Sequence, residues 1–136
     1  MTSPAPTALH GARVLVLEDE YFIAADLRDA LTECGASVLG PFRRTEEVVA
    51  AIARERPSMA LVDINLGLGP SFDAPRALRE ADIPFAFVTG YDQGAIVAEF
   101  AGVPRIEKPV AAAALCRTRS SCWGRRSPIP RLRRAR

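Results

Sequence analysis

Short runs of apolar residues recur along the chain, and stretches with a helical spacing separate them. A short continuous apolar run is typical of a strand that is buried on both faces of a parallel sheet. Apolar residues that recur every three or four positions instead predict the buried face of a helix. The predicted strands are 14–17, 36–41, 59–62, 83–88 and 103–106, and the predicted helices are 21–34, 45–57, 71–80 and 93–100.

The alternation of strands and helices predicts an α/β fold with one parallel sheet and helices on both of its faces. Right-handed crossovers leave few possible orders for the strands. A fifth helix can begin at 110–115, where the sequence is rich in alanine. Gly124, Pro128 and Pro130 interrupt any continuation, so this helix is predicted to be truncated or aberrant.

Charged and hydroxyl side chains stand where four of the predicted strands end. Taken strand by strand, they are Glu18 and Asp19, then Asp63, then Thr89, and then Lys108. The carboxyl ends of parallel strands meet along one edge of the sheet, where ligands bind in folds of this class. We therefore expect these side chains to converge on one site.

The converging side chains suit the transfer of a phosphoryl group to a carboxylate. Asp63 can accept the group without a general base, because a carboxylate is already ionised at neutral pH. Glu18 and Asp19 supply the oxygen ligands that Mg²⁺ prefers, and Mg²⁺ neutralises charge on phosphoryl oxygens. The Lys108 ammonium group and the Thr89 hydroxyl can each contact a phosphoryl oxygen.

The composition fits one small domain. The chain has 136 residues, of which 49% are hydrophobic and 25% are charged. No apolar run approaches the roughly 18 residues that span a bilayer, and the N-terminus lacks the pattern of a signal peptide. Cys34, Cys116 and Cys122 have no metal-binding spacing and predict reduced thiols. These features predict a cytoplasmic protein.

Charge is divided unevenly along the chain. All 16 acidic residues lie in 1–113 with ten basic ones, whereas 114–136 holds eight arginines and no acidic residue. We therefore expect a disordered lead-in at 1–11, a domain at 12–113 and a basic tail at 114–136. Three interpretations of the tail stay open: a segment that binds an anionic surface, a disordered extension, or a frameshifted end that replaces the true fifth helix.

The residues at the strand ends resemble those of a known family. Their order and spacing are similar to the receiver domain of two-component response regulators, over residues 12–113. The matching positions are Glu18, Asp19, Asp63, Thr89, Lys108 and Pro109. The resemblance implies a flavodoxin-like, doubly wound sheet of five parallel strands in the order 2-1-3-4-5. It also implies phosphorelay signalling, in which a histidine kinase donates a phosphoryl group and an output protein of unknown identity is contacted.

The same resemblance implies a role for each matching position. Asp63 would be the phospho-acceptor, Lys108 the phosphate contact and Thr89 the switch hydroxyl. The implied ligands of Mg²⁺ are Glu18, Asp19, Asp63 and the backbone carbonyl of Asn65. The peptide bond before Pro109 is cis in this family.

A narrower resemblance is to the FAT-GUY receivers, a bacterial subfamily that often lacks an output domain. It is carried by residues 63–67, 84–91 and 100–104. The subfamily implies a histidine kinase of the HWE or HisKA2 type as the partner. Arg105 stands where receivers usually carry a switch aromatic residue, so Tyr91 becomes the candidate for that role.

Other functions fit the sequence less well. A pseudo-receiver would keep the fold but would not be phosphorylated. An Mg²⁺-dependent aspartyl-phosphate phosphatase needs a second carboxylate two residues after the nucleophile, where this chain has Asn65. We therefore expect no enzyme turnover beyond slow autodephosphorylation. Specific DNA binding is not expected either, because no helix-turn-helix pattern is present. A loose arginine tail would contact phosphate groups by charge and would not recognise the base sequence.

Overall fold

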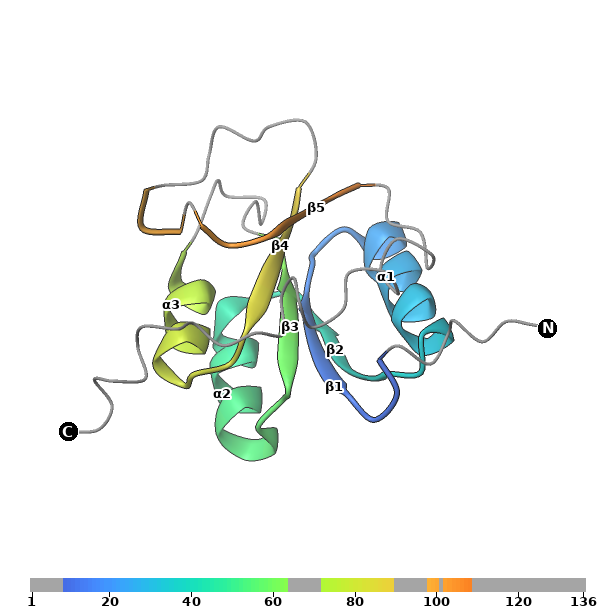
Figure 1. The fold of residues 1–136 in the computed structure, drawn as a ribbon, viewed down its shortest axis with the longest axis horizontal. Coiled ribbons are helices and arrows are strands. Elements are labelled where there is room, and N and C mark those ends of the chain that lie inside the picture. The colour runs from blue at the N-terminus through green and yellow to red at the C-terminus, as the bar shows by residue number, and fades with distance from the viewer. Residues whose placement is uncertain (1–8, 64–71, 90–97, 101, 109–136) are drawn as a thin grey trace.

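The fold is known from a computed structural model that describes residues 9–63, 72–89, 98–100 and 102–108 (Figure 1). The strands are β1 (Arg13–Leu17), β2 (Ser37–Phe42), β3 (Met59–Val62), β4 (Phe85–Thr89) and β5 (Arg105–Glu107). The helices are α1 (Tyr21–Glu33), α2 (Thr45–Glu55) and α3 (Asp73–Glu80), and a 3₁₀ turn, η3, covers Ala98–Phe100.

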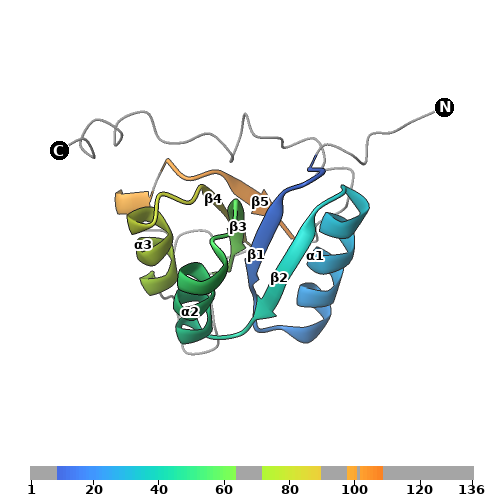
Figure 2. The ribbon, with the colours of Figure 1, turned by 90° about the horizontal axis from the view of Figure 1, so that it is seen from below.

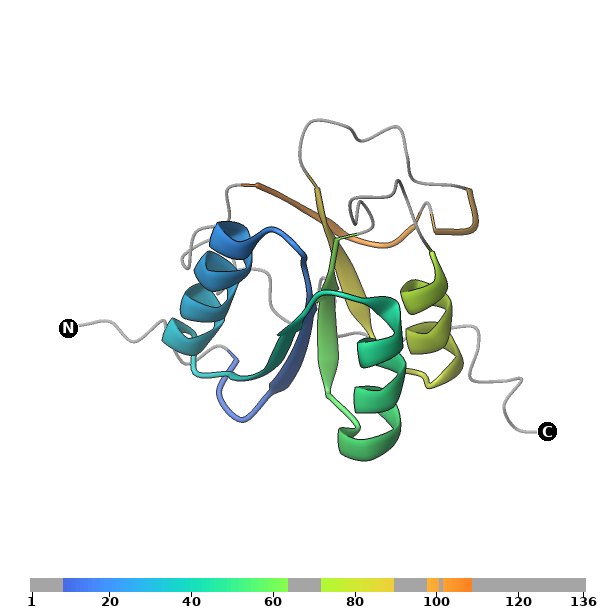
Figure 3. The same cartoon turned by 180° about the vertical axis from the view of Figure 1, so that it is seen from behind.

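The strands form one parallel sheet in the order β2-β1-β3-β4-β5 (Figures 1 and 3). This order confirms the predicted flavodoxin-like, doubly wound architecture. The central strands β1 and β3 carry the most continuous apolar runs, and all of their residues except Arg13 are buried. A central strand has neighbours on both edges and helices on both faces, which is why its sequence is apolar throughout.

Helices cover both faces of the sheet (Figure 2). Because successive side chains of a strand point to opposite faces, each of the strands β1 to β4 contributes to two separate apolar clusters. In β1, Val14 and Val16 pack in the cluster that contains Leu27 of α1. Leu15 and Leu17 pack in the other cluster, with residues of α2 and α3. The site at the end of β1 therefore rests on two packed layers.

Helices α1 and α2 match the predicted spacing of apolar residues. Ala24, Leu27 and Leu31 form the buried stripe of α1, and Gly35, with a φ of 93°, follows its end as expected for a left-handed position. Helix α2 begins at Thr45, where the spacing predicts its start. Glu47 satisfies this start of the helix: its carboxylate accepts the backbone N–H groups of Arg43 and Arg44 at 2.9 and 3.0 Å.

Strand β2 bends before its end, and this bend determines where its last residues lie. The pairing of β1 with β2 shifts between Leu15 and Leu17. Gly40 has a φ of 99°, and a Cβ there would lie 2.5 Å from the backbone nitrogen of Phe42, so only glycine fits. A cis peptide bond joins Gly40 to Pro41. The bend brings Phe42 to the end of β1, where its carbonyl accepts the N–H of Glu18 at 2.9 Å.

An aromatic cluster fills the space between the sheet and α3. Phe100 is fully buried and stacks on Phe72, with ring centroids 5.5 Å apart. It also makes edge-to-face contacts with Phe85 and Phe87 of β4. The Arg79 guanidinium lies 4.6 Å from the centre of the Phe100 ring. Pro75 lies in the first turn of α3, where its missing N–H has no cost.

Several predictions fall outside the described residues. The helix predicted at 93–100 is described only at 98–100, as a 3₁₀ turn. The loop that holds Asn65, together with Tyr91, Pro109, the fifth helix and the basic tail, lies outside them. The described chain begins at Leu9, inside the predicted lead-in, and Leu9 is buried. Across the described residues, the helices are too short and too polar to cross a membrane.

Cys34 differs from its predicted state. The sequence predicts reduced thiols, but the buried Cys34 takes part in a disulfide bond. Pairing of cysteines depends on the distance between their Cα atoms in the fold, and spacing along the chain does not give that distance.

The aromatic cluster gives a test of the fold. We expect Phe100→Ala to lower the free energy of unfolding by about 3–5 kcal/mol, because it removes a fully buried ring. Phe22→Ala is the matched control, because Phe22 is 72% exposed, and its effect should stay within about 0.5 kcal/mol. Urea unfolding followed by circular dichroism measures both. Equal losses for the two variants would contradict the described core.

Candidate functional site

The register of the sheet brings two carboxylates to the same place. Leu17 of β1 pairs with Val62 of β3, so the next residues, Glu18 and Asp63, leave the sheet side by side. The backbone N–H of Asp63 donates to the carbonyl of Leu17 at 2.9 Å, which fixes this arrangement. Asp19 follows directly in the turn before α1. The convergence expected from the strand ends is therefore present for these residues.

The three carboxylates form a compact acidic cluster. Oxygen atoms of Glu18, Asp19 and Asp63 lie within 4.8 Å of one another. Glu18 is 1% exposed and Asp63 is 5% exposed, whereas Asp19 is half-buried. Glu18 Oε2 accepts the backbone N–H of Glu20 at 3.1 Å. Glu18 Oε1 is buried and has no hydrogen bond.

Lys108 supplies the positive charge that faces this cluster. Its Nζ atom donates a hydrogen bond to Asp63 Oδ2 at 3.1 Å and lies 3.2 Å from Glu18 Oε1, an ion pair without hydrogen-bond geometry. Lys108 reaches both carboxylates because it follows β5, whose Glu107 pairs with Thr89 at the same edge of the sheet. Only 19% of its side chain is exposed, so water screens the pair weakly.

Burial and charge shift the protonation of the site. Burial raises the pKa of Glu18 to about 7, with a further rise from the Asp63 carboxylate, and the Glu20 backbone N–H and the Lys108 ammonium offset only part of this. Burial alone would lower the pKa of Lys108, but Asp63 and Glu18 outweigh it and the net pKa is raised. Lys108 therefore stays charged at neutral pH, while Glu18 exchanges its proton near pH 7.

The chemistry of the cluster fits a small divalent cation. Mg²⁺ prefers carboxylate oxygens, and the cluster offers one such oxygen from each of three residues. The buried Glu18 Oε1, which has no hydrogen bond, is an oxygen that a cation would satisfy. Three carboxylates against one ammonium group also leave the site negative once Glu18 is ionised. Glu18, Asp19 and Asp63 are thus the residues that would hold the metal.

The predicted site residues divide into two groups. The structure brings together Glu18, Asp19, Asp63 and Lys108. Thr89 ends β4 at the same edge, and its side chain is not among the described ones. Asn65, Tyr91 and Pro109 lie outside the described residues, so their roles stay predictions.

Sequence reasoning missed one part of this edge. Arg43 directly follows β2 and lines a pocket beside Glu18 and Asp19. The rule that ligands bind at the carboxyl ends of the strands applies to β2 as well, and it could have found Arg43. The signal is weak, because polar residues also suit an ordinary connection between a strand and the next helix.

Comparison with known proteins assigns the family. No family model matches the chain. The signal receiver domain of a modulated diguanylate cyclase from Desulfovibrio desulfuricans G20 is 34% identical, with a TM-score of 0.71, and the match covers 82% of this chain and 92% of that domain. The chain belongs to the response-regulator receiver family. Its sheet order and the acidic cluster at the carboxyl edge agree with that membership.

Other receivers show the same likeness. SdrG from Sphingomonas melonis Fr1 has a TM-score of 0.70 and 28% identity, with 78% of this receiver and 91% of SdrG covered. The phyllosphere-induced regulator PhyR of Methylorubrum extorquens is 37% identical over 89 residues, which are 63% of this receiver and 33% of PhyR. The receiver thus spans about a third or less of the length of the curated relatives that it matches.

Cation binding to the acidic cluster is directly testable. We expect Mg²⁺ at about 100 times its dissociation constant to raise the free energy of unfolding by about 2.7 kcal/mol. Asp19→Asn should remove most of this gain, because it removes one of the three carboxylates. Asp29→Asn is the matched control, because Asp29 is an exposed carboxylate outside the cluster.

Thermal unfolding at constant ionic strength measures the effect of Mg²⁺ on each variant. Two results would contradict a metal site at this cluster. One is an equal stabilisation of Asp19→Asn and the wild type by Mg²⁺, and the other is no stabilisation of either.

Proposed function

We propose that this receiver accepts a phosphoryl group on Asp63 from a histidine kinase and signals by protein contact. The observation that carries the proposal is the contact of the Lys108 ammonium with the Asp63 carboxylate at 3.1 Å, beside the Glu18 and Asp19 carboxylates. A carboxylate acceptor, a cation contact and carboxylate ligands for a metal are the parts that phosphoryl transfer needs. Membership of the receiver family supports the same function.

In the proposed transfer, an Asp63 carboxylate oxygen attacks phosphorus. A bond forms between this oxygen and phosphorus, the bond from phosphorus to the donor's histidine nitrogen breaks, and the nitrogen keeps the electron pair. Lys108, already beside Asp63, would contact a phosphoryl oxygen of the product. Mg²⁺, when bound by Glu18, Asp19 and Asp63, supplies charge neutralisation for the phosphoryl oxygens. We propose that the Thr89 hydroxyl responds to phosphorylation of Asp63. We propose Tyr91 as the switch aromatic residue, because Arg105 stands at the position where receivers usually carry it.

Helix α1 offers a surface for the proposed kinase. Tyr21 and Phe22 are 74% and 72% exposed, and their rings meet edge to face with centroids 5.2 Å apart. Exposed aromatic side chains of this kind are common at the centre of protein interfaces. Ile23 packs partly against the core, so the contact is assigned to Tyr21 and Phe22. We propose a kinase of the HWE or HisKA2 type, in keeping with the FAT-GUY resemblance.

The other parts of the proposal follow from the sequence. A phosphatase is disfavoured, because Asn65 stands where such an enzyme needs a second carboxylate. We propose a cytoplasmic phosphorelay protein in which residues 12–113 form the receiver and the output passes to another protein. Residues 1–11 and 114–136 are proposed as a lead-in and a basic tail outside it.

Small-molecule phosphorylation tests the function. With Mg²⁺ and acetyl phosphate, intact mass spectrometry should show one added phosphoryl group on the wild type and none on Asp63→Asn. Asp73→Asn is the matched control, because Asp73 is an exposed carboxylate on α3, and it should be modified like the wild type. A chelator should abolish modification.

Two results would contradict the proposal. If the folded wild type gains no phosphoryl group, the chain is a pseudo-receiver. If Asp63→Asn gains as much as the wild type, the acceptor is another residue.

A further inference from the structure

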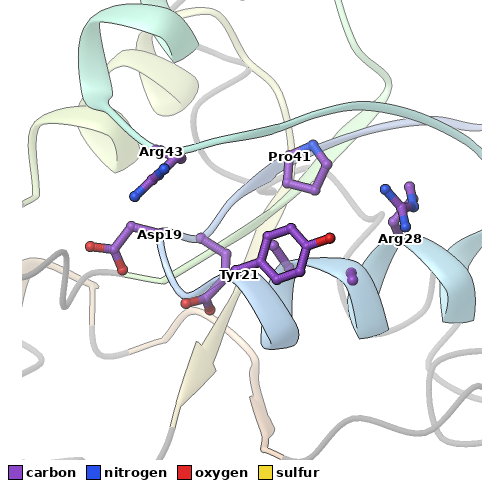
Figure 4. Close-up of a pocket in the computed structure, with 8 residues that line it drawn as sticks. Asp19, Tyr21, Arg28, Pro41 and Arg43 are labelled. Carbon is purple, nitrogen blue, oxygen red and sulfur yellow. The ribbon is translucent and has the colours of Figure 1, made fainter.

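A pocket lies beside the acidic cluster, between α1 and the end of β2 (Figure 4). Its volume is about 160 Å³. Its lining residues are Glu18, Asp19, Tyr21, Ala24, Ala25, Arg28, Pro41 and Arg43. The proposed chemistry at Asp63 uses Glu18 and Asp19, and Tyr21 is proposed above only as an outer contact for the kinase, so the interior of the pocket has no role in the function proposed above.

The middle of the pocket is apolar and large enough for a small ring. The Tyr21 ring and Pro41 form its walls, and Ala24 and Ala25 leave space along α1. For comparison, an apolar cavity of about 150 Å³ in another protein holds benzene. The bend at Gly40 places the Pro41 wall, and Tyr21 is the first residue of α1. The pocket can therefore take an apolar group of about the size of a benzene ring.

The charged residues of the pocket are not equivalent. Glu18 is paired with Lys108 at 3.2 Å, and Arg28 is paired with Asp29 at 3.5 Å. Within the part of the chain that the structure describes, Asp19 and Arg43 form no ion pair. Figure 4 shows both at one end of the pocket, with Arg28 at the other end. This end thus offers one negative and one positive group.

We propose that the pocket binds a free α-amino acid with an apolar ring side chain. The α-ammonium group would pair with Asp19, the α-carboxylate with Arg43, and the side chain would lie between Tyr21 and Pro41. A simple organic anion would meet repulsion from Asp19, and a simple organic amine would meet repulsion from Arg43. A zwitterionic head matches both charges. This inference goes beyond phosphoryl transfer and does not rest on it.

L-Phenylalanine is the probe, added to the full chain labelled with ¹⁵N in the presence of EDTA. Amide shifts should saturate with a dissociation constant of about 1 mM, as expected for a ligand of this size with modest contacts. The largest shifts should fall on residues of α1 and on Arg43. 3-Phenylpropionate lacks the ammonium group and 2-phenylethylamine lacks the carboxylate, so each should bind at least about tenfold more weakly.

Variants locate the site. Ala25→Leu fills the pocket and should abolish binding, and Tyr21→Ala, an exposed position that the fold tolerates, should weaken it about tenfold. Arg43→Gln should weaken it at least about tenfold, whereas Arg54→Gln, an exposed arginine at the far end of α2, should leave it unchanged.

Four results would overturn the inference while the spectra show a folded protein. The first is no saturable binding of phenylalanine by the wild type, and the second is binding that survives both Ala25→Leu and Tyr21→Ala. The third is an equal loss of affinity in Arg43→Gln and Arg54→Gln. The fourth is binding of 3-phenylpropionate or 2-phenylethylamine that is as tight as that of phenylalanine. Phosphorylation of Asp63 is measured separately, so its failure is distinguishable from failure here.

Discussion

The geometry of the functional site depends on two buried carboxylates, those of Glu18 and Asp63, which the ammonium group of Lys108 holds together. The register of β1 and β3 places Glu18 and Asp63 side by side, and neither can move away without breaking the sheet. Two like charges in a buried place are unfavourable unless they are paired or protonated. Lys108 meets both at 3.1–3.2 Å, and the pKa of Glu18 stays raised because of its burial and, second, because of the repulsion from Asp63.

This constraint explains why the site responds to cations and to phosphate. A folded protein with an excess of buried negative charge gains free energy when a divalent cation or a proton neutralises it. The charge of Lys108 is shared between two carboxylates, so a phosphoryl group on Asp63 would directly change the contacts of the Lys108 ammonium group. The sheet is rigid because apolar clusters pack on both of its faces, and such a scaffold holds the charged groups at fixed distances.

Much of the fold could be predicted, because strong local patterns carry it. The apolar runs of β1 and β3 and the stripe of α1 are direct consequences of burial, and the structure confirms them. Features that depend on particular side-chain contacts were less predictable. The Glu47 carboxylate satisfies the start of α2, and the stack of Phe100 on Phe72 joins residues that are far apart in the sequence.

The residues of the site could be predicted from the sequence, but the protonation of Glu18 could not. Strand ends identified Glu18, Asp19, Asp63 and Lys108, because the topology of a parallel sheet gathers such residues at one edge. The raised pKa of Glu18 requires knowledge of its burial and neighbours, which no sequence pattern gives. The pocket beside Arg43 depends on the bend at Gly40, and that bend arises from a φ value rather than from hydrophobicity.

The most direct test of the central claim is to locate the modified residue chemically. The chain is treated with acetyl phosphate and Mg²⁺, reduced with borohydride, digested and mapped by mass spectrometry. Borohydride reduces an aspartyl phosphate to homoserine, so we expect homoserine at position 63 and an unchanged Glu18 and Asp19. Homoserine at Asp19, or an unmodified Asp63 in a protein shown to be folded, would contradict the claim that Lys108 and the acidic cluster serve Asp63 as the acceptor.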